Sequence, residues 1–334
     1  MSFTRDIADY PEGIVLAVDK PYRWTSADVI RKLKFAAIKH FGKKNLKVGH
    51  AGTLDPLATG VLLVCIGNAC KRAQQLQDHD KEYIARIRFG ATTPSYDLEK
   101  EVDRTFPFAH ITADAVRDAL PAFLGSQEQV APLFSAKSVD GVRAYELARK
   151  LYKARAIYAQ PSGHVSSGYA SSGHADATCH SDFSSDSEQR EESLFDATAL
   201  ETLQRNKIVI SDLELLDFAA ASEGRGPQTE GTVWSPVVQP VGGAEVEQSG
   251  TESPRTLSPS PSARINVADT SAMGLPEAVI RIACSKGTYI RAFARDLGET
   301  LGSGAHLSGL IRSRSGDYRL EDALSLDQAL QLLA

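Results

Sequence analysis

The segment 48–71 (VGHAGTLDPLATGVLLVCIGNACK) holds the side chains best suited to chemistry. In this segment a glycine-rich loop that contains His50 and Asp55 leads directly into an apolar run. Glycines permit tight turns, and a strand behind the loop could hold the Asp55 carboxylate at the mouth of a cleft. A carboxylate in that place can act as a nucleophile, a base or a metal ligand. An Asp before a Pro is also a common turn former, so residue type alone favours a structural role.

The elements that must position this loop follow from the hydrophobic pattern. Period-two alternation predicts strands at 13–20, 81–90, 203–219, 277–287 and 308–320. A period of three to four predicts helices at 111–125, 287–302 and 325–333. It also predicts a helix that Ser26 could cap and that would bury Val29, Leu33 and Ala37. Because strands and helices do not alternate regularly, we expect an α+β fold rather than a doubly wound sheet.

Two segments differ in composition from the rest. Ten of the 33 residues of 161–193 are Ser, with several acidic residues, so 154–206 is predicted to be a flexible, Ser-rich acidic insertion. The segment 222–276 holds seven of the chain's 15 prolines and is predicted to be a second flexible loop, rich in Pro, Gly and Ser. We expect one domain over 1–334 that carries both insertions.

The formal net charge of -5 argues against a protein that binds nucleic acid through bulk positive charge. The two insertions, however, carry -5 and -3 of it, which leaves +3 on the other 226 residues. The stretch 31–47 (RKLKFAAIKHFGKKNLK) has eight basic residues and no acid, which suits contacts with phosphates. Four scattered cysteines, the absence of an export signal and short apolar runs predict a cytoplasmic protein that does not enter a membrane.

Taken as a whole, the segment 48–71 resembles the TruB family, the RNA pseudouridine synthases of the bacterial tRNA T-arm type. Five further motifs of that family occur along the chain in the family's order. DKPYRWTS (19–26) resembles its Lys-Pro motif, and DKEYIARIRFG (80–90) resembles its Lys-x-Tyr strand. APLFSAKSVDGVRAYELAR (131–149) resembles its Pro-Pro-x-Tyr-Ser-Ala motif, and CSKGTYIRAFARDLGE (284–299) and HLSGLIRSRSGDY (306–318) resemble its late motifs. Five ordered motifs outweigh the turn-former interpretation of Asp55.

The chain departs from the family pattern in places. Ala51 stands where the family often has Thr, Ala131-Pro132 with Phe134 replaces Pro-Pro and Tyr, and the segment with Asp97 lacks the Gly that often follows. These changes leave the implied reaction intact. Because the chain ends soon after Tyr318, we expect no C-terminal PUA-like domain.

The resemblance implies the pseudouridine synthase fold, a mixed, largely antiparallel sheet flanked by helices. It implies a monomer that isomerises uridine to pseudouridine at position 55 in the T loop of tRNA, after flipping the base out of the loop. No cofactor and no metal are implied, because nothing is oxidised and no group leaves the complex.

The resemblance also implies the catalytic residues. Asp55 is the catalytic carboxylate, and attack on ribose C1′, attack on the base and abstraction of a ribose proton all remain open as its role. Arg291 matches the arginine that pairs with this aspartate. Tyr83 matches the tyrosine that stacks on the target base, and Tyr289 matches a second active-site tyrosine, a candidate proton carrier. Without the resemblance, both tyrosines would read as half-buried core rings and Arg291 as a surface ion pair.

The implied substrate-binding residues are His50, Lys20 and Leu310. His50 matches a histidine that lies near the displaced base, and Leu310 is a candidate apolar wall of the pocket. Lys20 is expected to shape its motif or to contact RNA rather than to perform chemistry.

Two other functions stay open. One is a guide-RNA-dependent pseudouridine synthase subunit, which the expected lack of a C-terminal domain argues against. The other is a tRNA-folding chaperone that acts through binding. The four residues His164, His174, Cys179 and His180 match no standard zinc spacing, so no metal site is predicted there.

Overall fold

The computed structural model describes residues 3–132, 134, 138–139, 142–143, 205–222 and 265–334. Most of the two predicted insertions lies outside these residues, as do the four His and Cys residues considered for a metal site. The chain divides into two compact units, one of 1–129 with 207–334 and one of 130–206. In the second unit, β8 (Ser138–Val139) and β9 (Val142–Arg143) form an antiparallel hairpin.

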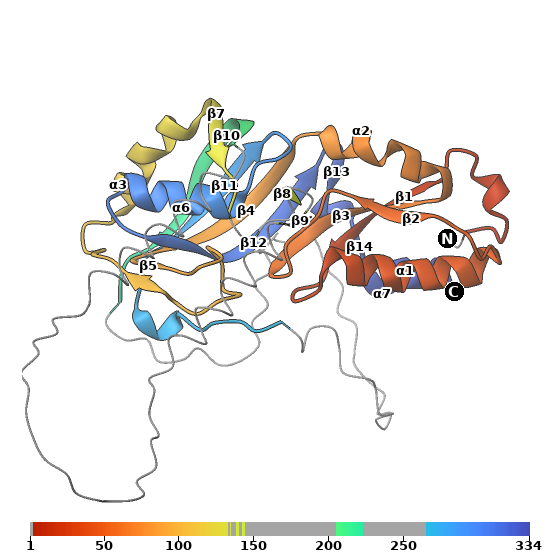
Figure 1. Ribbon diagram of the computed structural model, residues 1–334, viewed down its shortest axis with the longest axis horizontal. Helices are drawn as coiled ribbons and strands as arrows, with labels where there is room; N and C mark the ends of the chain where they lie inside the picture. The colour runs from red at the N-terminus through yellow and green to blue at the C-terminus, as the bar shows by residue number, and fades with distance from the viewer. Residues whose placement is uncertain (1–2, 133, 135–137, 140–141, 144–204, 223–264) are drawn as a thin grey trace, which may run out of the picture. The chain divides into compact units, whose positions relative to one another are not determined.

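The first unit is built on a mixed ten-stranded sheet (Figure 1). Its order is β14-β1-β3-β12-β4-β11-β10-β7, with β13 on β12 and β2 on β3. The pairs β1–β14 and β3–β12 are parallel, whereas the pairs that join β12, β4, β11 and β10 are antiparallel. The predicted α+β class with a largely antiparallel mixed sheet is therefore confirmed.

The strand bounds agree with the predicted segments to within a few residues. The strands of the sheet are β1 (Ile14–Lys20), β2 (Val48–Ala51), β3 (Ala58–Ile66), β4 (Lys81–Phe89), β7 (Gly125–Val130), β10 (Arg205–Ala219), β11 (Glu277–Cys284), β12 (Ala305–Ser315), β13 (Tyr318–Arg319) and β14 (Leu324–Ser325). A separate two-stranded ribbon is formed by β5 (Ala91–Thr92) and β6 (Arg104–Thr105).

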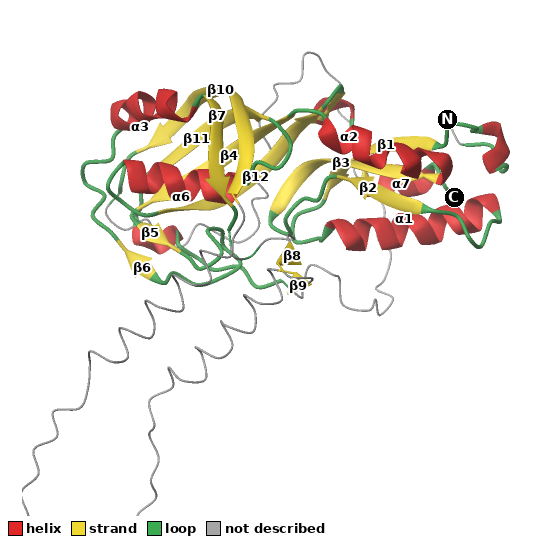
Figure 2. Ribbon diagram, turned by 45° about the horizontal axis from the view of Figure 1, so that its top comes forward, coloured by secondary structure: helices red, strands yellow, loops and turns green. Residues whose placement is uncertain are grey.

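Helices cover the sheet in two groups. They are α1 (Ser26–Phe41), α2 (Ala73–Asp78), α3 (Ala113–Ala119), α6 (Ile290–Thr300) and α7 (Leu326–Gln331), with short 3-10 turns at Ile7–Asp9, Gly67–Arg72, Leu120–Phe123, Ser271–Met273 and Leu320–Asp322. Helices α1 and α7 lie side by side near β1 and β14, and α6 lies against β12 and β4 (Figure 2). None of the helices in the described part of the chain is long and apolar enough to cross a membrane.

Helix α1 shows how a cap sets the position of an element. Thr25 rather than Ser26 is the N-cap, because Thr25 accepts a hydrogen bond from the Asp28 amide and the Asp28 carboxylate accepts one from Thr25. The predicted cap was one residue late. The predicted stripe of Val29, Leu33 and Ala37 is completely buried, as expected.

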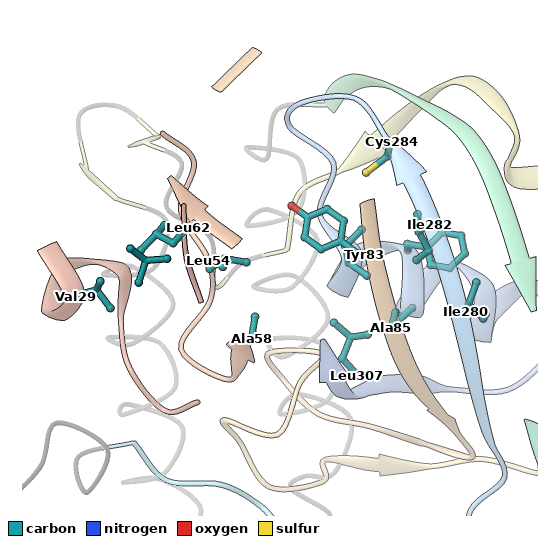
Figure 3. Packing of buried hydrophobic residues seen from close by; sticks show 14 of the residues in the cluster. Val29, Leu54, Ala58, Leu62, Tyr83, Ala85, Ile280, Ile282, Cys284 and Leu307 are labelled. Carbon is teal, nitrogen blue, oxygen red and sulfur yellow. The ribbon is translucent and has the colours of Figure 1, made fainter. Parts of the chain in front are cut away.

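Strand β4 and helix α6 supply much of the core between them. Tyr83, Ala85, Ile87 and Phe89 alternate into the core along β4, in line with the period-two pattern of 81–90. Figure 3 shows Tyr83 and Ala85 in this packing. One face of α6 is also buried; its members are Ile290, Phe293, Ala294 and Leu297. The parts of the site that these elements carry are thus fixed from behind by apolar packing.

Three predicted segments differ at their ends. The helix expected over 111–125 ends at Ala119, and Pro121 lies in the 3-10 turn that follows, in line with its helix-breaking geometry. The first predicted insertion ends before β10, which begins at Arg205. The end of the second is folded, because Ala268 is buried and its amide donates to the Leu98 carbonyl.

Candidate active site

The Asp55 loop connects β2 to β3 and is tied down on both sides of the aspartate. The Ser26 hydroxyl, in the first turn of α1, accepts from the Leu54 amide at 2.9 Å and donates to its carbonyl at 3.1 Å. The Ala58 amide donates to the Asp55 carbonyl at 3.1 Å and closes a turn around Pro56. The loop backbone is fixed in this way while the Asp55 side chain remains 36% exposed.

Arg291 holds the Asp55 carboxylate in a two-pronged ion pair. Its Nε donates to Oδ2 at 2.9 Å and its Nη2 donates to Oδ1 at 3.1 Å. The Arg291 side chain, in the first turn of α6, is only 5% exposed. The structure therefore brings together the two residues that the resemblance pairs, and the fork geometry fixes the plane of the carboxylate.

A second carboxylate, Asp97, completes the surroundings of Arg291. Its Oδ2 lies 3.6 Å from Arg291 Nε, and its Oδ1 accepts from the Ser95 hydroxyl at 2.6 Å and the Glu99 amide at 2.9 Å. Arg291 Nη1 also donates to the Ser95 carbonyl at 3.1 Å. Asp97 was assigned no role from sequence. The Ser95-x-Asp97 spacing, which is typical of a local side-chain turn, could have indicated that its carboxylate is held in place.

The charges of this cluster shift one another's proton affinities. Burial alone would lower the pKa of Arg291, but Asp55 and Asp97 outweigh it and raise that pKa. Burial raises the pKa of Asp97 above the ordinary Asp value, although Arg291 opposes it. Burial and the neighbouring Asp97 raise the pKa of Glu99 to about 7. Arg291 thus stays a fixed cation that faces the Asp55 carboxylate.

Asp55 lies in the lining of a small, partly open pocket. The charged lining residues are Asp55, Asp97 and Arg291, and the others are Leu57, Ala58, Leu98, Leu307, Ser308, Gly309 and Leu310. Leu310, predicted as an apolar wall, lies in this lining. An ion pair at the edge of an apolar, partly open pocket is suited to bind a flat heterocycle and act on one of its bonds.

A break in the β4–β12 ladder shapes the wall beside Leu310. The register shifts between Leu307 and Gly309, so that Ser308 has no partner residue on β4. The Ser308 hydroxyl instead donates to the Glu277 carboxylate at 2.6 Å. Such bulges re-aim side chains next to functional sites, and this one points residues 308–310 at the pocket.

Tyr83 is buried and is not among the described residues that line the pocket. It is on β4, 9% exposed, opposite Arg312 of β12. Its hydroxyl points away from Ile282, toward the part of the cluster that holds Leu54 (Figure 3). Burial raises the pKa of Tyr83, and Arg312 opposes this. Tyr83 therefore lies beside the Asp55 loop as a neutral ring.

Lys20 does not have the position that substrate binding requires. The side chain is completely buried, and its ammonium donates to the carbonyls of Pro21, Trp24 and Pro56 at 3.0, 2.6 and 3.1 Å. Burial lowers the pKa of Lys20 to about 7, while the carboxylates of Asp55 and Asp19 act to raise it. Of the two expectations for Lys20, these contacts favour the one in which it shapes its motif, here by holding the loop around Asp55, over contact with RNA.

His50 and Tyr289 are placed near the site by their elements. His50 is half-buried on β2, and burial and the nearby Arg312 lower its pKa, which favours a neutral imidazole. Tyr289 is the N-cap residue of α6; its amide donates to Gln129 Oε1 at 2.8 Å and its carbonyl accepts from Gln129 Nε2 at 3.2 Å. Neither side chain lines the pocket around Asp55 among the described residues.

Sequence reasoning missed Arg312, which is 1% exposed. Its guanidinium donates to the carbonyl of Val61 at 2.6 Å, of Gly52 at 3.2 Å and of Thr53 at 3.5 Å. Arg312 thereby ties the start of the Asp55 loop to β12. Arginine on an exposed-looking strand gives no sign in sequence that backbone carbonyls will surround it.

Comparison with known proteins decides the family. The family model described as TruB family pseudouridylate synthase (N terminal domain) matches residues 39–158. The tRNA pseudouridine synthase B of Phocaeicola vulgatus is 39% identical over 319 residues, which is 96% of this chain and 92% of that protein. This chain belongs to the TruB family. The tRNA pseudouridine synthase B of Bacteroides thetaiotaomicron (39% identity, 95% and 91% of the two chains) and that of Deinococcus deserti (32%, 94% and 77%) are further relatives.

Solved structures add a likeness of fold to this TruB relationship. A chain of the crystal structure of a Cbf5–Nop10–Gar1 complex matches with a TM-score of 0.50 at 18% identity. The match covers 97% of this chain but 56% of that one. The expected pseudouridine synthase fold is thus confirmed by the family and by the sheet described above.

Proposed function

We propose that this protein is a tRNA pseudouridine synthase that converts uridine to pseudouridine with Asp55 as its catalytic carboxylate. The observation that carries the proposal is the Asp55–Arg291 fork at the edge of a partly apolar pocket. Its relatives bear the name tRNA pseudouridine synthase B and align over almost the whole chain. TruB membership and the site geometry point to the same reaction.

The reaction requires few groups because it is an isomerisation. The bond between ribose C1′ and uracil N1 breaks, the uracil turns, and C1′ bonds to C5. The hydrogen on C5 leaves as a proton and N1 gains one, so atoms and electrons balance without an oxidant or a leaving group. The Asp55 carboxylate must be fixed in direction, and the Arg291 fork supplies that condition.

The remaining roles combine the lining of the pocket with what the resemblance to the TruB family implies for the two tyrosines. The apolar walls, Leu57 and Leu310 among them, would exclude water from the detached uracil. The ring of Tyr83 would stack on the flipped base, and Tyr289 at the start of α6 would carry a proton. Flipping a base out of a folded loop costs a few kcal/mol, which such stacking offsets.

The finer parts of the proposal concern the substrate and the state of the protein. We propose position 55 in the T loop as the target uridine, and a monomer in the cytoplasm as the working form. The half-buried neutral His50 would lie beside the space that the displaced base vacates.

A bare tRNA transcript labelled with tritium at uridine C5 tests the proposal. The purified chain is expected to release one tritium per tRNA, with pseudouridine mapped to position 55 and none elsewhere. Activity that appears only when a second RNA is added would support the guide-RNA alternative instead. No release under either condition would contradict the proposed reaction.

A further inference from the structure

The outer face of α1 carries a dense run of exposed cations that the site does not use. All seven Lys and Arg residues between Arg31 and Lys47 are exposed, and that stretch contains no Asp or Glu. The eighth basic residue of the stretch, His40, is 4% exposed, and its ring nitrogens lie 3.0 Å from the Thr4 carbonyl and 3.3 Å from the Ala334 carbonyl. His40 anchors the helix, whereas the seven others form a cationic surface.

An exposed aromatic ring lies in the middle of this surface. Phe35 is 75% exposed, on the side of α1 opposite the buried Leu33 stripe. With 3.6 residues per turn, Arg31 and Lys39 lie one turn to either side of Phe35. We call Arg31, Lys32, Lys34, Phe35 and Lys39 the α1 basic face; Lys43, Lys44 and Lys47 continue it. A single exposed ring needs no partner by itself, but a ring set among cations offers a surface on which a base can stack.

Most of these cations have no ion-pair partner among the residues that the structure describes. Arg31 pairs with Asp28 at 2.8 Å, and the Lys32 ammonium lies 5.3 Å from the centre of the Trp24 ring. Within the ranges that the structure describes, Lys34 and Lys39 form no ion pair. Like charges one turn apart repel each other, so the bare face destabilises the helix slightly. A polyanion that binds this face would neutralise the repulsion, and the release of counterions from the polyanion would favour the binding.

The α1 basic face begins at the active site. Ser26, the first residue of α1, bonds both backbone groups of Leu54, the residue before Asp55. Val29, one turn on, packs in the same cluster as Leu54 (Figure 3). The 16 residues of α1 then lead away from the loop for about 24 Å. A nucleic acid with one base at Asp55 would therefore have its backbone within reach of this face.

We propose that the α1 basic face binds the ribose–phosphate backbone of the tRNA outside the modified loop, with Phe35 stacked on a ribose or an unpaired base. This inference rests on the proposed function for the identity of the RNA. Lysines on a helix read phosphates without regard to sequence, and a single ring adds a stacking platform. The apolar stripe of α1 is already buried against the sheet, so no second apolar side is left for a membrane.

The test removes the charges without removing the helix. The variant Lys34→Gln/Lys39→Gln changes two exposed residues to good helix formers. The logarithmic slope of tRNA affinity against salt is expected to fall by about two, with tRNA affinity about ten-fold weaker. The matched control, Arg117→Gln/Arg319→Gln, removes two exposed cations from α3 and β13 and should leave the slope unchanged. An unchanged slope in the α1 variant, or an equal fall in the control, would overturn the inference.

Steady-state kinetics separate this surface from the catalytic site. The α1 variant should raise KM for full-length tRNA and leave kcat at saturation unchanged. Binding like wild type together with wild-type pseudouridine formation would remove the surface and leave the function standing. If the wild type formed no pseudouridine but the α1 variant still lost tRNA affinity, the surface would stand and the function would fall.

The aromatic part of the inference has its own control. Phe35→Ala should weaken tRNA binding at least about five-fold, and Phe35→Tyr, which keeps the ring, should restore it. Equal binding by both variants would contradict stacking. If Phe35→Ala changed the sedimentation coefficient of the RNA-free protein, the ring would be covered by a second copy and the RNA assignment would be wrong.

Discussion

At the scale of single residues, the site depends on one buried cation. Arg291 is almost fully buried and lies between two carboxylates, Asp55 at 2.9 Å and Asp97 at 3.6 Å. A buried charge is costly unless it is paired and hydrogen-bonded, and breaking such a pair leaves an uncompensated charge. Arg291 therefore fixes Asp55 and makes the fold around the pocket depend on the same contact.

Arg291→Lys keeps the positive charge but loses the two-pronged contact. We expect kcat to fall at least about 100-fold with little change in tRNA affinity, because a misplaced catalytic group loses much of its effective concentration. Single-turnover pseudouridine formation measures this. Arg295→Lys is the matched control on the same helix, where the arginine pairs with Asp296 and is expected to matter little. Equal activity in the two variants would show that the fork is not required.

Glu99 links the site to pH-dependent stability. Its pKa is raised from 4.5 to about 7 in the folded state, so the folded protein favours the protonated form. The stability that Glu99 contributes is present below the unfolded-state pKa of 4.5 and is lost as pH rises toward 7. Glu99→Gln should therefore stabilise the protein by about 1–3 kcal/mol near pH 8 and by almost nothing near pH 4. Thermal unfolding at both pH values measures this; a gain only at low pH would contradict it.

Residue roles were predictable where a motif names a pair, and not where burial decides. Asp55 and Arg291 are 236 positions apart, and only the ordered motifs connected them before the structure. The role of Lys20 depends on three carbonyls, including that of Pro56 from another loop, which meet only after folding. His40 counted as basic in sequence for the same reason, because its exposure is a property of the fold.

At the scale of elements, the parallel contact between β3 and β12 positions the Asp55 loop. Ala58, Thr59 and Gly60 pair with Leu310, Ile311 and Arg312, so the pocket wall and the loop share one ladder. Gly60 has φ of +99°, and a Cβ there would lie 2.3 Å from the Arg312 carbonyl oxygen. This close approach accounts for a glycine inside an otherwise apolar strand.

Gly60→Ala is expected to damage both stability and activity. Backbone must move to admit the methyl group, and we expect a loss of at least about 3 kcal/mol, since clash adds to the left-handed strain. Gly42→Ala is the control: its φ is also positive, at +61°, but no atom lies within 4 Å of the added Cβ. It should cost about 1 kcal/mol and leave the rate unchanged. Equal unfolding temperatures for the two variants would contradict the clash.

Element types were largely readable from sequence, but their neighbours were not. Alternation predicted β4 because every second residue from Tyr83 is buried. The start of α1 was missed by one residue because Thr25 and Ser26 can both cap, and Asp28 decides between them by completing the capping box. The order in which β12 lies between β3 and β4 depends on contacts far apart in the chain, which local pattern does not contain.

At the scale of the whole molecule, charge is divided unevenly. The chain carries -5 in total, but 154–206 alone carries -5, and the basic residues collect on α1 and the loop after it. The net charge alone therefore argued against nucleic-acid binding, whereas the distribution of charge along the chain favoured it. The family and the fold class followed from motif order, whereas the division into two compact units did not.

Deleting residues 160–200 tests this division. Since the segment is acidic, its removal should leave tRNA affinity unchanged or improve it, most clearly at low salt where repulsion is least screened. Filter binding over a salt series measures this. A large loss of affinity would mean that the segment supplies contacts to the RNA.

The central claim is that the carboxylate of Asp55 performs the isomerisation. Asp55→Asn keeps the shape of the side chain and removes its charge, and it should be examined for tRNA binding and for single-turnover pseudouridine formation on the same transcript. We predict a tRNA affinity within a few-fold of wild type and no detectable pseudouridine. Pseudouridine formed by Asp55→Asn at a rate near that of the wild type would contradict the account.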